Sequence, residues 1–181
     1  MKKILRKKLL VVRKKKYLEI SHEQISNIFK LLNKEYKNKV IIGGYAPVNY
    51  EYDCLKILNF LETKNFVTCL PKIKNDFQMD FFKYSSKDPL NVNKFGIPEP
   101  FNTNNKILPD LIFVPLLGYD NKLNRLGYGG GFYDRYFEKI SKIKQVIKIG
   151  LAFSFQEIKK LPINKFDKKL DRIITEKKVL I

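Results

Sequence analysis

The sequence predicts an α/β fold, an open, mainly parallel sheet with helices on both faces, in which residues 1–181 form a single compact domain. Residues 39–71 follow a strand, helix, strand pattern, the βαβ arrangement that joins parallel strands. Residues 111–114 are a continuous apolar run between Pro109 and Pro115, typical of a strand buried on both faces. With 181 residues and 44% hydrophobic content, the chain can bury one substantial core.

The segment that starts at residue 21 carries a helix N-terminal signature. "SHEQ", residues 21–24, is a capping box in which Ser21 is the N-cap and Gln24 follows three positions later. Apolar residues then recur at helical spacing, at Ile25, Ile28, Phe29, Leu32 and Tyr36. His22, the only histidine, falls in the exposed first turn, so we do not expect it to be catalytic or a ligand.

The βαβ pattern supplies the next elements. "KVIIGGYAP", residues 39–47, is a strand that runs out into a loop, and a helix follows with one apolar face formed by Cys54, Ile57, Leu58 and Leu61. "FVTCLP", residues 66–71, is a second strand, which Pro71 ends, and "MDFFKY", residues 79–84, is a candidate third. "KFGIPEPFNTNN", residues 94–105, is too rich in Pro, Gly and Asn to be regular and predicts a surface loop.

The C-terminal half continues the alternation. A helix is predicted to begin inside or just after the glycines of "NRLGYGGGFYDRY", residues 124–136, because apolar residues recur at Tyr133, Tyr136, Phe137 and Ile140. "VIKIGLAF", residues 146–153, predicts a buried strand, and "LDRIIT", residues 170–175, a short late one. The glycine segment thus lies between a parallel strand and a helix, where open α/β sheets bind ligands.

The net charge of +18 raises the alternative of a nucleic-acid-binding protein, since a basic surface attracts polyanions whatever the fold. Only five of the 36 basic residues are arginine, and the lysines are spread along the whole chain. Base readout relies on the arginine fork, so we attribute the charge to compositional bias. The densest run, "RKKKY" at residues 13–17, is either a nucleic-acid contact or a solvated helix face, and we favour the solvated face.

Cysteine usage and hydropathy bear on the compartment. Cys54 and Cys69 lie in apolar surroundings without metal-ligand spacing, which argues against a disulfide framework and a zinc site. No apolar run approaches the roughly 20 residues of a membrane span. The N-terminus lacks the apolar core of a signal peptide. We therefore expect a cytoplasmic protein with no membrane partner. We also expect a monomer, although no feature of the sequence determines the oligomeric state.

The glycine segment has the features of an anion-binding loop. Its four glycines permit positive φ and close approach of a ligand, and N–H groups leading into a helix N-terminus suit a phosphate. A dinucleotide fingerprint would need glycine where Phe132 stands, and a P-loop would need Gly-Lys followed by Ser or Thr. The segment therefore belongs to neither common phosphate loop, and a plain structural turn is the alternative.

Charged residues near this segment and near the first strand are candidates for the site. Asp134, in the first helical turn, either stabilises the helix N-terminus or binds Mg²⁺ on a phosphate. Arg125 either pairs with phosphate or caps a surface turn. In "NYEYD", residues 49–53, Asp53 is the expected N-cap of the next helix. Glu51 has no such role, which makes it the better candidate to accept hydrogen bonds from ligand amino groups.

These residues belong to a set of segments that resembles the 5-formyltetrahydrofolate cyclo-ligase family, also called methenyltetrahydrofolate synthetase, nearly end to end. In family order the segments are "KKILR", "YAPVNYEYD", "CLPKI", "MDFFKY", "FGIPEP", "PDLIFVPLLGYDNKLNRLGYGGGFYDRY" and "LDRIITE". The resemblance implies an open α/β sheet and conversion of 5-formyltetrahydrofolate to 5,10-methenyltetrahydrofolate, with ATP becoming ADP and phosphate and Mg²⁺ required. Such phosphoryl transfer needs positioning and charge neutralisation more than a protein nucleophile.

The resemblance also implies the site residues. Its ATP contacts fall on Lys2, Arg6, Arg125, Leu126, Gly127, Tyr128, Gly129, Gly130, Gly131, Phe132 and Tyr133. Its folate contacts fall on Glu51, Tyr128, Gly129, Gly130, Gly131 and Phe132. Catalytic roles fall on Arg125 and Asp134, and the Mg²⁺ carboxylates on Asp134 and Asp171. Some family members carry lysine where this chain has Gly130, so another cation is expected to neutralise phosphate here.

An ATP- and Mg²⁺-dependent folate ligase that acts on small molecules is therefore the leading prediction. The alternative from another class is a basic α/β module that binds nucleic acid without folate turnover. A third is a protein that binds folate or nucleotide and has lost catalysis.

Overall fold

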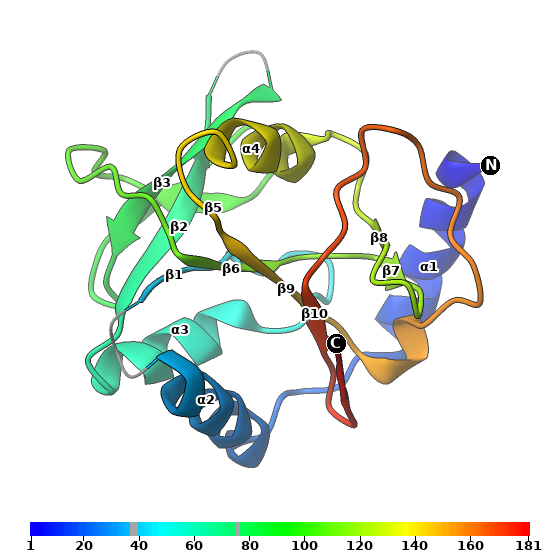
Figure 1. The fold of residues 1–181 in the computed structure, drawn as a ribbon, viewed down its shortest axis with the longest axis horizontal. Coiled ribbons are helices and arrows are strands. Elements are labelled where there is room, and N and C mark those ends of the chain that lie inside the picture. The colour runs from blue at the N-terminus through cyan, green and yellow to red at the C-terminus, as the bar shows by residue number, and fades with distance from the viewer. Residues whose placement is uncertain (37–39, 75–76) are drawn as a thin grey trace.

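The computed structural model describes residues 1–36, 40–74 and 77–181, arranged around one large sheet (Figure 1). The helices are α1 (Lys2–Lys16), α2 (His22–Tyr36), α3 (Cys54–Thr63) and α4 (Phe132–Ile140), with a 3₁₀ turn at Ser154–Gln156. The strands are β1 (Ile41–Gly43), β2 (Val67–Ile73), β3 (Met79–Tyr84), β4 (Leu90–Val92), β5 (Pro98–Pro100), β6 (Leu111–Val114), β7 (Gly118–Tyr119), β8 (Arg125–Leu126), β9 (Ile147–Leu151), β10 (Arg172–Ile174) and β11 (Val179–Leu180).

Seven strands form the central sheet in the order β11-β10-β9-β6-β1-β2-β3. The five inner strands run parallel, and Ile42 of β1 lies opposite Thr68 of β2 and Leu111 of β6. The edge strands β11 and β3 are antiparallel to their neighbours. This topology confirms the predicted open, mainly parallel sheet, and β6 is buried at all four positions as the sequence predicts.

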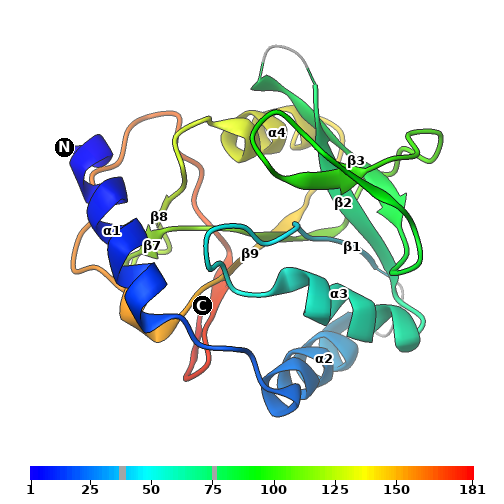
Figure 2. The ribbon, with the colours of Figure 1, turned by 180° about the vertical axis from the view of Figure 1, so that it is seen from behind.

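Helices cover both faces of the sheet, as predicted (Figures 1 and 2). On one face, Leu32 of α2 and Leu58 of α3 share a core cluster with Phe113 of β6. On the other face, α4 contributes Phe137 to a second cluster. Helix α1 lies apart from these layers, beside β7 and β8, where its Leu9 joins a small third cluster. α1 therefore packs on the segments that lead from β6 toward α4.

The two predicted helix caps are present. The amide of Ser21 donates to Gln24 Oε1 at 2.7 Å, and the amide of Gln24 donates to Ser21 Oγ at 3.2 Å, which is the reciprocal bonding of a capping box. Asp53 Oδ1 accepts from the amide of Lys56 at 3.1 Å at the start of α3. His22 is exposed, as expected for the first turn.

Strand β2 continues two residues past Pro71, where the sequence predicts its end. Pro71 lies opposite Phe81 in the antiparallel pairing with β3. The carbonyl oxygen of Cys69 accepts from the amide of Gly44 at 2.9 Å, so the backbone polar groups of Cys69 point toward β1. Pro71 lies two residues further along the strand, so its backbone points in the same direction. Because β1 ends at Gly43, no ladder bond is lost at the proline.

Three short strand pairings were missed by the sequence analysis. β5 lies inside the segment predicted as an irregular loop and pairs with β4, with Val92 opposite Pro98. β7 and β8 form a hairpin, with Gly118 opposite Leu126, between β6 and the glycine segment. β11 extends the sheet beyond β10. Strands of two or three residues are too short to show alternating polarity. Lys39, the predicted start of the first strand, lies outside the described residues.

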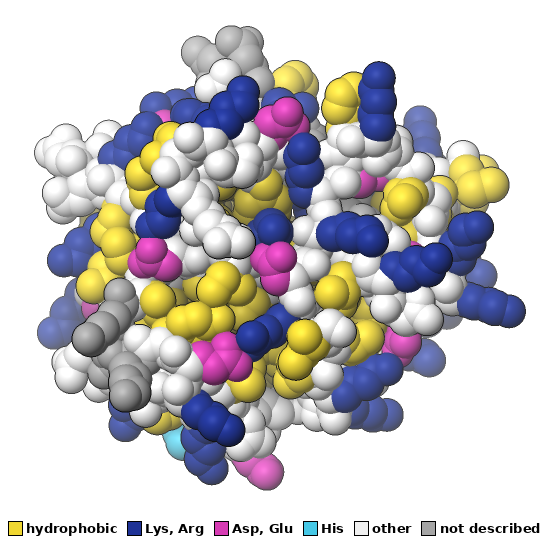
Figure 3. All heavy atoms as spheres, in the orientation of Figure 1, with side chains coloured by type: hydrophobic (Ala, Val, Ile, Leu, Met, Phe, Trp, Pro, Cys, Tyr) yellow, Lys and Arg dark blue, Asp and Glu magenta, His cyan; other side chains and the backbone are white. Residues whose placement is uncertain are grey.

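The basic residues are distributed over the surface. Figure 3 shows Lys and Arg side chains spread across one face and interleaved with acidic and apolar ones. This spread agrees with a compositional bias. None of the helices in the described ranges is long and apolar enough to cross a bilayer.

Candidate active site

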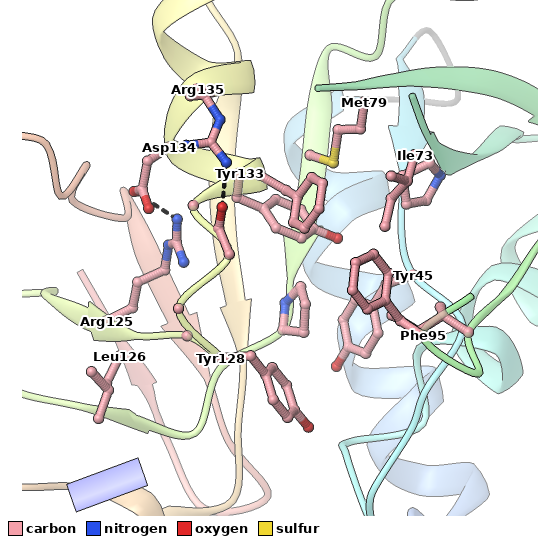
Figure 4. Close-up of a pocket in the computed structure, with 18 of the residues that line it drawn as sticks. Tyr45, Ile73, Met79, Phe95, Arg125, Leu126, Tyr128, Tyr133, Asp134 and Arg135 are labelled. Carbon is pink, nitrogen blue, oxygen red and sulfur yellow. Dashed lines mark hydrogen bonds and ion pairs between the residues drawn. The ribbon is translucent and has the colours of Figure 1, made fainter. Parts of the chain in front are cut away.

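A cavity of about 1030 Å³ lies at the carboxyl ends of the parallel strands (Figure 4). Residues that follow or end these strands line it, namely Tyr45 after β1, Ile73 at the end of β2 and Pro115 after β6. The glycine segment and the first turn of α4 form another wall. The cavity is slightly larger than the ~300–1,000 Å³ that is typical of small-molecule pockets.

With the exception of Asp171, the structure places every predicted site residue in the lining of this one cavity. They come from three distant parts of the chain: the start of α1, the loop after β1, and the segment from β8 into α4. The sequence order alone does not reveal this convergence, which depends on the crossovers of the sheet.

Two of the loop glycines have backbone conformations that favour glycine. Gly129 has φ +106°, and Gly131, the residue before α4, has φ +68°. A Cβ atom on Gly129 would lie 3.0 Å from Arg6 Cζ, and one on Gly131 would lie 3.0 Å from Arg135 Nη1. The bare backbone therefore lets two guanidinium groups lie directly against the loop.

Arg125 and Asp134 form an ion pair across the loop (Figure 4). Arg125 Nη2 donates to Asp134 Oδ1 at 2.8 Å, and the guanidinium lies 5.8 Å from the centroid of the Tyr133 ring. Asp134 Oδ1 also accepts from the amide of Lys168 at 3.0 Å. Arg125 Nε is buried without a hydrogen-bond partner among the described residues, so one donor of this guanidinium is unused. Asp134 lies in the first turn of α4, as predicted.

Helix α1 brings its predicted cations to the same wall. Arg6 Nε donates to the carbonyl oxygen of Gly127 at 2.8 Å. Lys2 Nζ donates to Asp167 Oδ2 at 2.5 Å, and both residues line the cavity. Lys2 and Arg6 are four residues apart, so one helix face presents both. Lys2, Arg6 and Arg125 therefore define a cationic end of the cavity, in which Lys2 is paired with Asp167 and Arg125 with Asp134.

Glu51 is a buried carboxyl group in the cavity wall. Its Oε2 accepts from the amide of Val48 at 2.9 Å, a structural bond that the sequence analysis did not predict. Its Oε1 has no hydrogen-bond partner in the described part of the chain and lies 3.9 Å from Arg13 Nη1. Burial raises the pKa of Glu51 to about 7, although the Val48 amide, the Arg13 charge and the Tyr128 hydroxyl oppose that rise. A ligand amino group would satisfy the unpaired oxygen.

The other end of the cavity is apolar. Figure 4 shows Met79, Ile73, Phe95 and Tyr45 across the cavity from β8. Phe95 packs edge-on against Phe132 of the glycine wall, with ring centroids 6.1 Å apart. None of these four was predicted as a site residue, because an apolar residue in a strand or loop looks the same in the sequence whether it faces the core or a cavity.

Arg135 was also missed. Its Nη2 donates to the carbonyl oxygen of Gly130, and its Nε donates to the carbonyl oxygen of Phe77 at 3.1 Å. Its guanidinium lies 5.9 Å from the centroid of the Phe132 ring. A cation therefore contacts Gly130, the position at which the family resemblance implies that a cation must replace a loop lysine.

The structure does not bring Asp171 to the cavity. Asp171 accepts from the amide of Lys148 at 2.7 Å and from its Nζ at 3.1 Å. These residues lie at the amino ends of β9 and β10, whereas the cavity lies at the carboxyl ends. In the C-terminal segment, the carboxylate that reaches the cavity is Asp167. Asp167 and Asp171 both lie among lysines, so the sequence alone does not show which of them reaches the cavity.

The prediction of a solvated face for residues 13–17 is wrong for its first member. Lys14, Lys15 and Lys16 are exposed, but Arg13 is fully buried. The helical spacing contains a signal for the burial of Arg13. Arg13 lies 11 residues, about three turns, from Lys2 and therefore on the same face of α1 as the predicted site residue.

The carboxylates of the cavity fit a weakly chelated cation. Among the described residues, no group of three or more His, Cys, Asp and Glu side chains is arranged to hold a metal ion. Asp134 lines the cavity with Glu138 and Asp167, and its Oδ2 makes no hydrogen bond with the described part of the chain. This donor set suits Mg²⁺, which binds one or two carboxylates and takes its other ligands from phosphate and water.

Comparison with known proteins agrees with this architecture. The sequence model of the 5-formyltetrahydrofolate cyclo-ligase family matches residues 1–176. A Schizosaccharomyces pombe protein described as a probable 5-formyltetrahydrofolate cyclo-ligase is 33% identical over 162 residues, which cover 81% of this chain and 78% of that protein. The 5-formyltetrahydrofolate cyclo-ligase of Mycoplasma genitalium is 31% identical over 162 residues, 86% of each chain.

A solved structure extends the similarity to the fold. The NMR structure of Aquifex aeolicus 5,10-methenyltetrahydrofolate synthetase matches with a TM-score of 0.74 and 30% identity, covering 98% of this chain and 91% of that one. Sequence and fold therefore agree over nearly the whole length. The chain belongs to the 5-formyltetrahydrofolate cyclo-ligase family, a family of ligases.

Proposed function

We propose that the protein converts 5-formyltetrahydrofolate to 5,10-methenyltetrahydrofolate while ATP becomes ADP and phosphate. The observation that carries the proposal is one continuous cavity with two chemically different ends. Lys2, Arg6 and Arg125 line the cationic end, which suits a triphosphate. The apolar end, with the buried Glu51 in its wall, suits a flat ring that bears amino groups. The glycine segment borders both ends.

The chemistry divides into two displacements. The formyl oxygen attacks the γ-phosphorus of ATP, the bond to the β-phosphate oxygen breaks, and ADP leaves. The lone pair of the 10-nitrogen then attacks the formyl carbon, the carbon–oxygen bond breaks with release of phosphate, and the nitrogen loses its proton. Neither step needs a protein nucleophile, and the described residues that line the cavity include no Cys or His.

The residues of the cationic end would then position the transferred phosphoryl group. Arg125 lines the cavity and is held in place by Asp134, so its guanidinium would be positioned to neutralise phosphate charge. When bound at Asp134, Mg²⁺ would supply further neutralisation of phosphate charge. Arg135 lies against the carbonyl of Gly130 and would replace the loop lysine of other family members. Asp171 has no role in this site, because it does not line the cavity.

The test follows the near-UV absorbance of methenyltetrahydrofolate after purified protein is mixed with 5-formyltetrahydrofolate and Mg-ATP. We expect a rise that requires both ATP and Mg²⁺, with omission of each as the control. Absence of the rise, while both ligands bind, would select a binding protein without catalysis. Nucleic-acid binding with a steep salt dependence and no folate turnover would select the basic module instead.

A further inference from the structure

We propose that Arg13 is a positioning residue that orients Tyr128 and the loop of residues 46–51 for the folate end of the cavity. Arg13 lies in α1 and does not line the cavity, so it would act through the residues it holds. The inference rests on the proposed function and adds to it a residue outside the substrate contacts.

Arg13 ties together three segments that are distant in sequence. Its Nε donates to the carbonyl oxygen of Asn49 at 2.9 Å, and its Nη1 donates to that of Leu116 at 3.2 Å. Its Nη2 donates to the hydroxyl oxygen of Tyr128. Asn49 belongs to the loop after β1, Leu116 follows β6, and Tyr128 belongs to the glycine segment. One side chain thereby fixes three of the segments from which the cavity is built.

Burial of the Arg13 charge costs free energy. Its side chain is fully buried and its guanidinium stays protonated, so its donors must be satisfied for the site to be stable. The nearest carboxylate oxygen, Glu51 Oε1, is 3.9 Å away and makes no hydrogen bond with it. The ion pair is therefore loose, and Arg13 makes no direct hydrogen bond to this oxygen of Glu51. A guanidinium that served only to cancel the carboxylate would bond it directly.

Tyr128 depends on this contact for its orientation. Gly127 and Gly129 flank it, so the backbone on either side restrains it weakly. Tyr128 lines the cavity and is 41% exposed as a residue, while its hydroxyl is bound by Arg13 and its ring centroid lies 5.5 Å from Arg13 Cζ. Loss of the guanidinium would free the ring to turn into solvent.

Helix α1 provides the rigidity that such a role needs. Arg6 and Arg13 are seven residues apart, about two turns, and project from one side of the helix. Arg6 bonds the backbone of the loop at Gly127, and Arg13 bonds the side chain of the next residue, Tyr128. α1 therefore holds the loop backbone with one arginine and its aromatic side chain with the other.

The experiment compares Arg13→Gln, Tyr128→Phe and the double variant with Lys14→Gln, which removes one charge from an exposed position of the same helix. We expect Arg13→Gln and Tyr128→Phe each to raise KM for the folate about tenfold, with KM for ATP changed less than about twofold. We expect the double variant to be no worse than Arg13→Gln within about twofold, because both changes break one interaction. Lys14→Gln should match the wild type.

A second readout does not depend on turnover. Chymotrypsin cuts after exposed aromatic residues, so the rate of cleavage between Tyr128 and Gly129, followed by mass spectrometry, reports how firmly the ring is held. We expect faster cleavage in Arg13→Gln and an unchanged rate in Lys14→Gln, two variants that leave the cleaved bond itself unaltered.

The outcomes separate this inference from the proposed function. If the wild type lacks folate turnover, the proposed function fails, and the cleavage rates still decide whether Arg13 holds the loop. If the wild type turns over but the folded Arg13→Gln protein keeps its folate KM and cleavage rate, the inference is overturned. Should Arg13→Gln fail to fold, Tyr128→Phe breaks the same bond, and a wild-type folate KM in that variant would also overturn it.

Discussion

Arg125 Nη2 and Asp134 Oδ1 are joined by a 2.8 Å hydrogen bond between residues nine positions apart, and the chain between them contains all the glycines of the loop. The bond fastens the end of the β7–β8 hairpin to the first turn of α4. The loop is therefore closed at its base by a charged pair, and its four glycines line the cavity between the two partners.

Substitution of either partner should remove turnover and leave the fold intact. We expect Arg125→Ala and Asp134→Ala each to lower kcat by about 100-fold or more, the size of effect found when one electrostatic group of an active site is lost. Thermal unfolding and the absorbance assay measure both properties. Arg172→Ala is the control, because Arg172 also forms an ion pair, with Glu35 at 2.7 Å, on residues that do not line the cavity. Wild-type rates in both active-site variants would refute the assigned roles.

A comparison of two glycines distinguishes the effect of backbone strain from the effect on ligand binding. Gly96 and Gly129 both have positive φ, but a Cβ atom on Gly96 meets nothing within 4 Å, whereas one on Gly129 meets Arg6. Gly96→Ala and Gly129→Ala should each cost about 1–2 kcal/mol of stability for the left-handed backbone. Only Gly129→Ala should raise KM for ATP, by about tenfold, because it displaces Arg6. An equal KM for ATP in the two variants would count against Arg6 as a nucleotide contact.

Glu51 should make the protein less stable as pH rises. Its pKa of about 7 in the folded state exceeds the ordinary 4.5, so the folded protein holds the proton more tightly than the unfolded chain does. The free energy of unfolding therefore falls between pH 4.5 and about 7 and then levels off. In Glu51→Gln this loss is absent, so the variant should match the wild type near pH 5 and exceed it by on the order of 2–3 kcal/mol at pH 8.

Urea unfolding of both proteins at the two pH values measures this difference. Glu23→Gln, an exposed change in the first turn of α2, should shift stability by less than about 1 kcal/mol at either pH. A constant difference between Glu51→Gln and wild type at both pH values would show that Glu51 does not titrate in this range. The folate KM of Glu51→Gln should rise, since its amide no longer offers a charged acceptor.

The two aspartates that the family resemblance associates with Mg²⁺ should behave differently. Asp134→Asn should raise the Mg²⁺ concentration needed for half-maximal turnover, because its carboxylate lies in the cavity. Asp171→Asn should leave that concentration unchanged, because its carboxylate is bonded to Lys148 at the other end of the sheet. A titration of turnover against free Mg²⁺ for each variant distinguishes them. An increase in Asp171→Asn alone would reverse the assignment.

Local signals predicted most of the fold. The capping box at Ser21, the N-cap at Asp53 and the apolar run of β6 depend on neighbours in sequence, and all three are present. Pairings between distant segments were missed, such as β4 with β5, because two or three residues carry no periodic signal. Pro71 was misjudged for a related reason, since its effect depends on where the neighbouring strand ends.

The candidate site was predictable only in part. The glycine segment, Arg125 and Asp134 are contiguous, so their chemistry is visible in the sequence. Arg13 looked like part of a solvated basic run because its partners lie more than a hundred residues away or on another loop. Asp171 and Asp167 both lie among lysines, and only the direction of β10 decides which one reaches the cavity.

The contacts of α1 also bear on how the protein matures. Lys2, Arg6 and Arg13 bond Asp167, Gly127 and Tyr128, which lie 165, 121 and 115 residues further along the chain. During synthesis, α1 leaves the ribosome long before these partners exist, and pairings of such separation form slowly. The cavity is therefore completed only near the end of translation, so a nascent or truncated chain that lacks the last third can assemble part of the sheet but not the site.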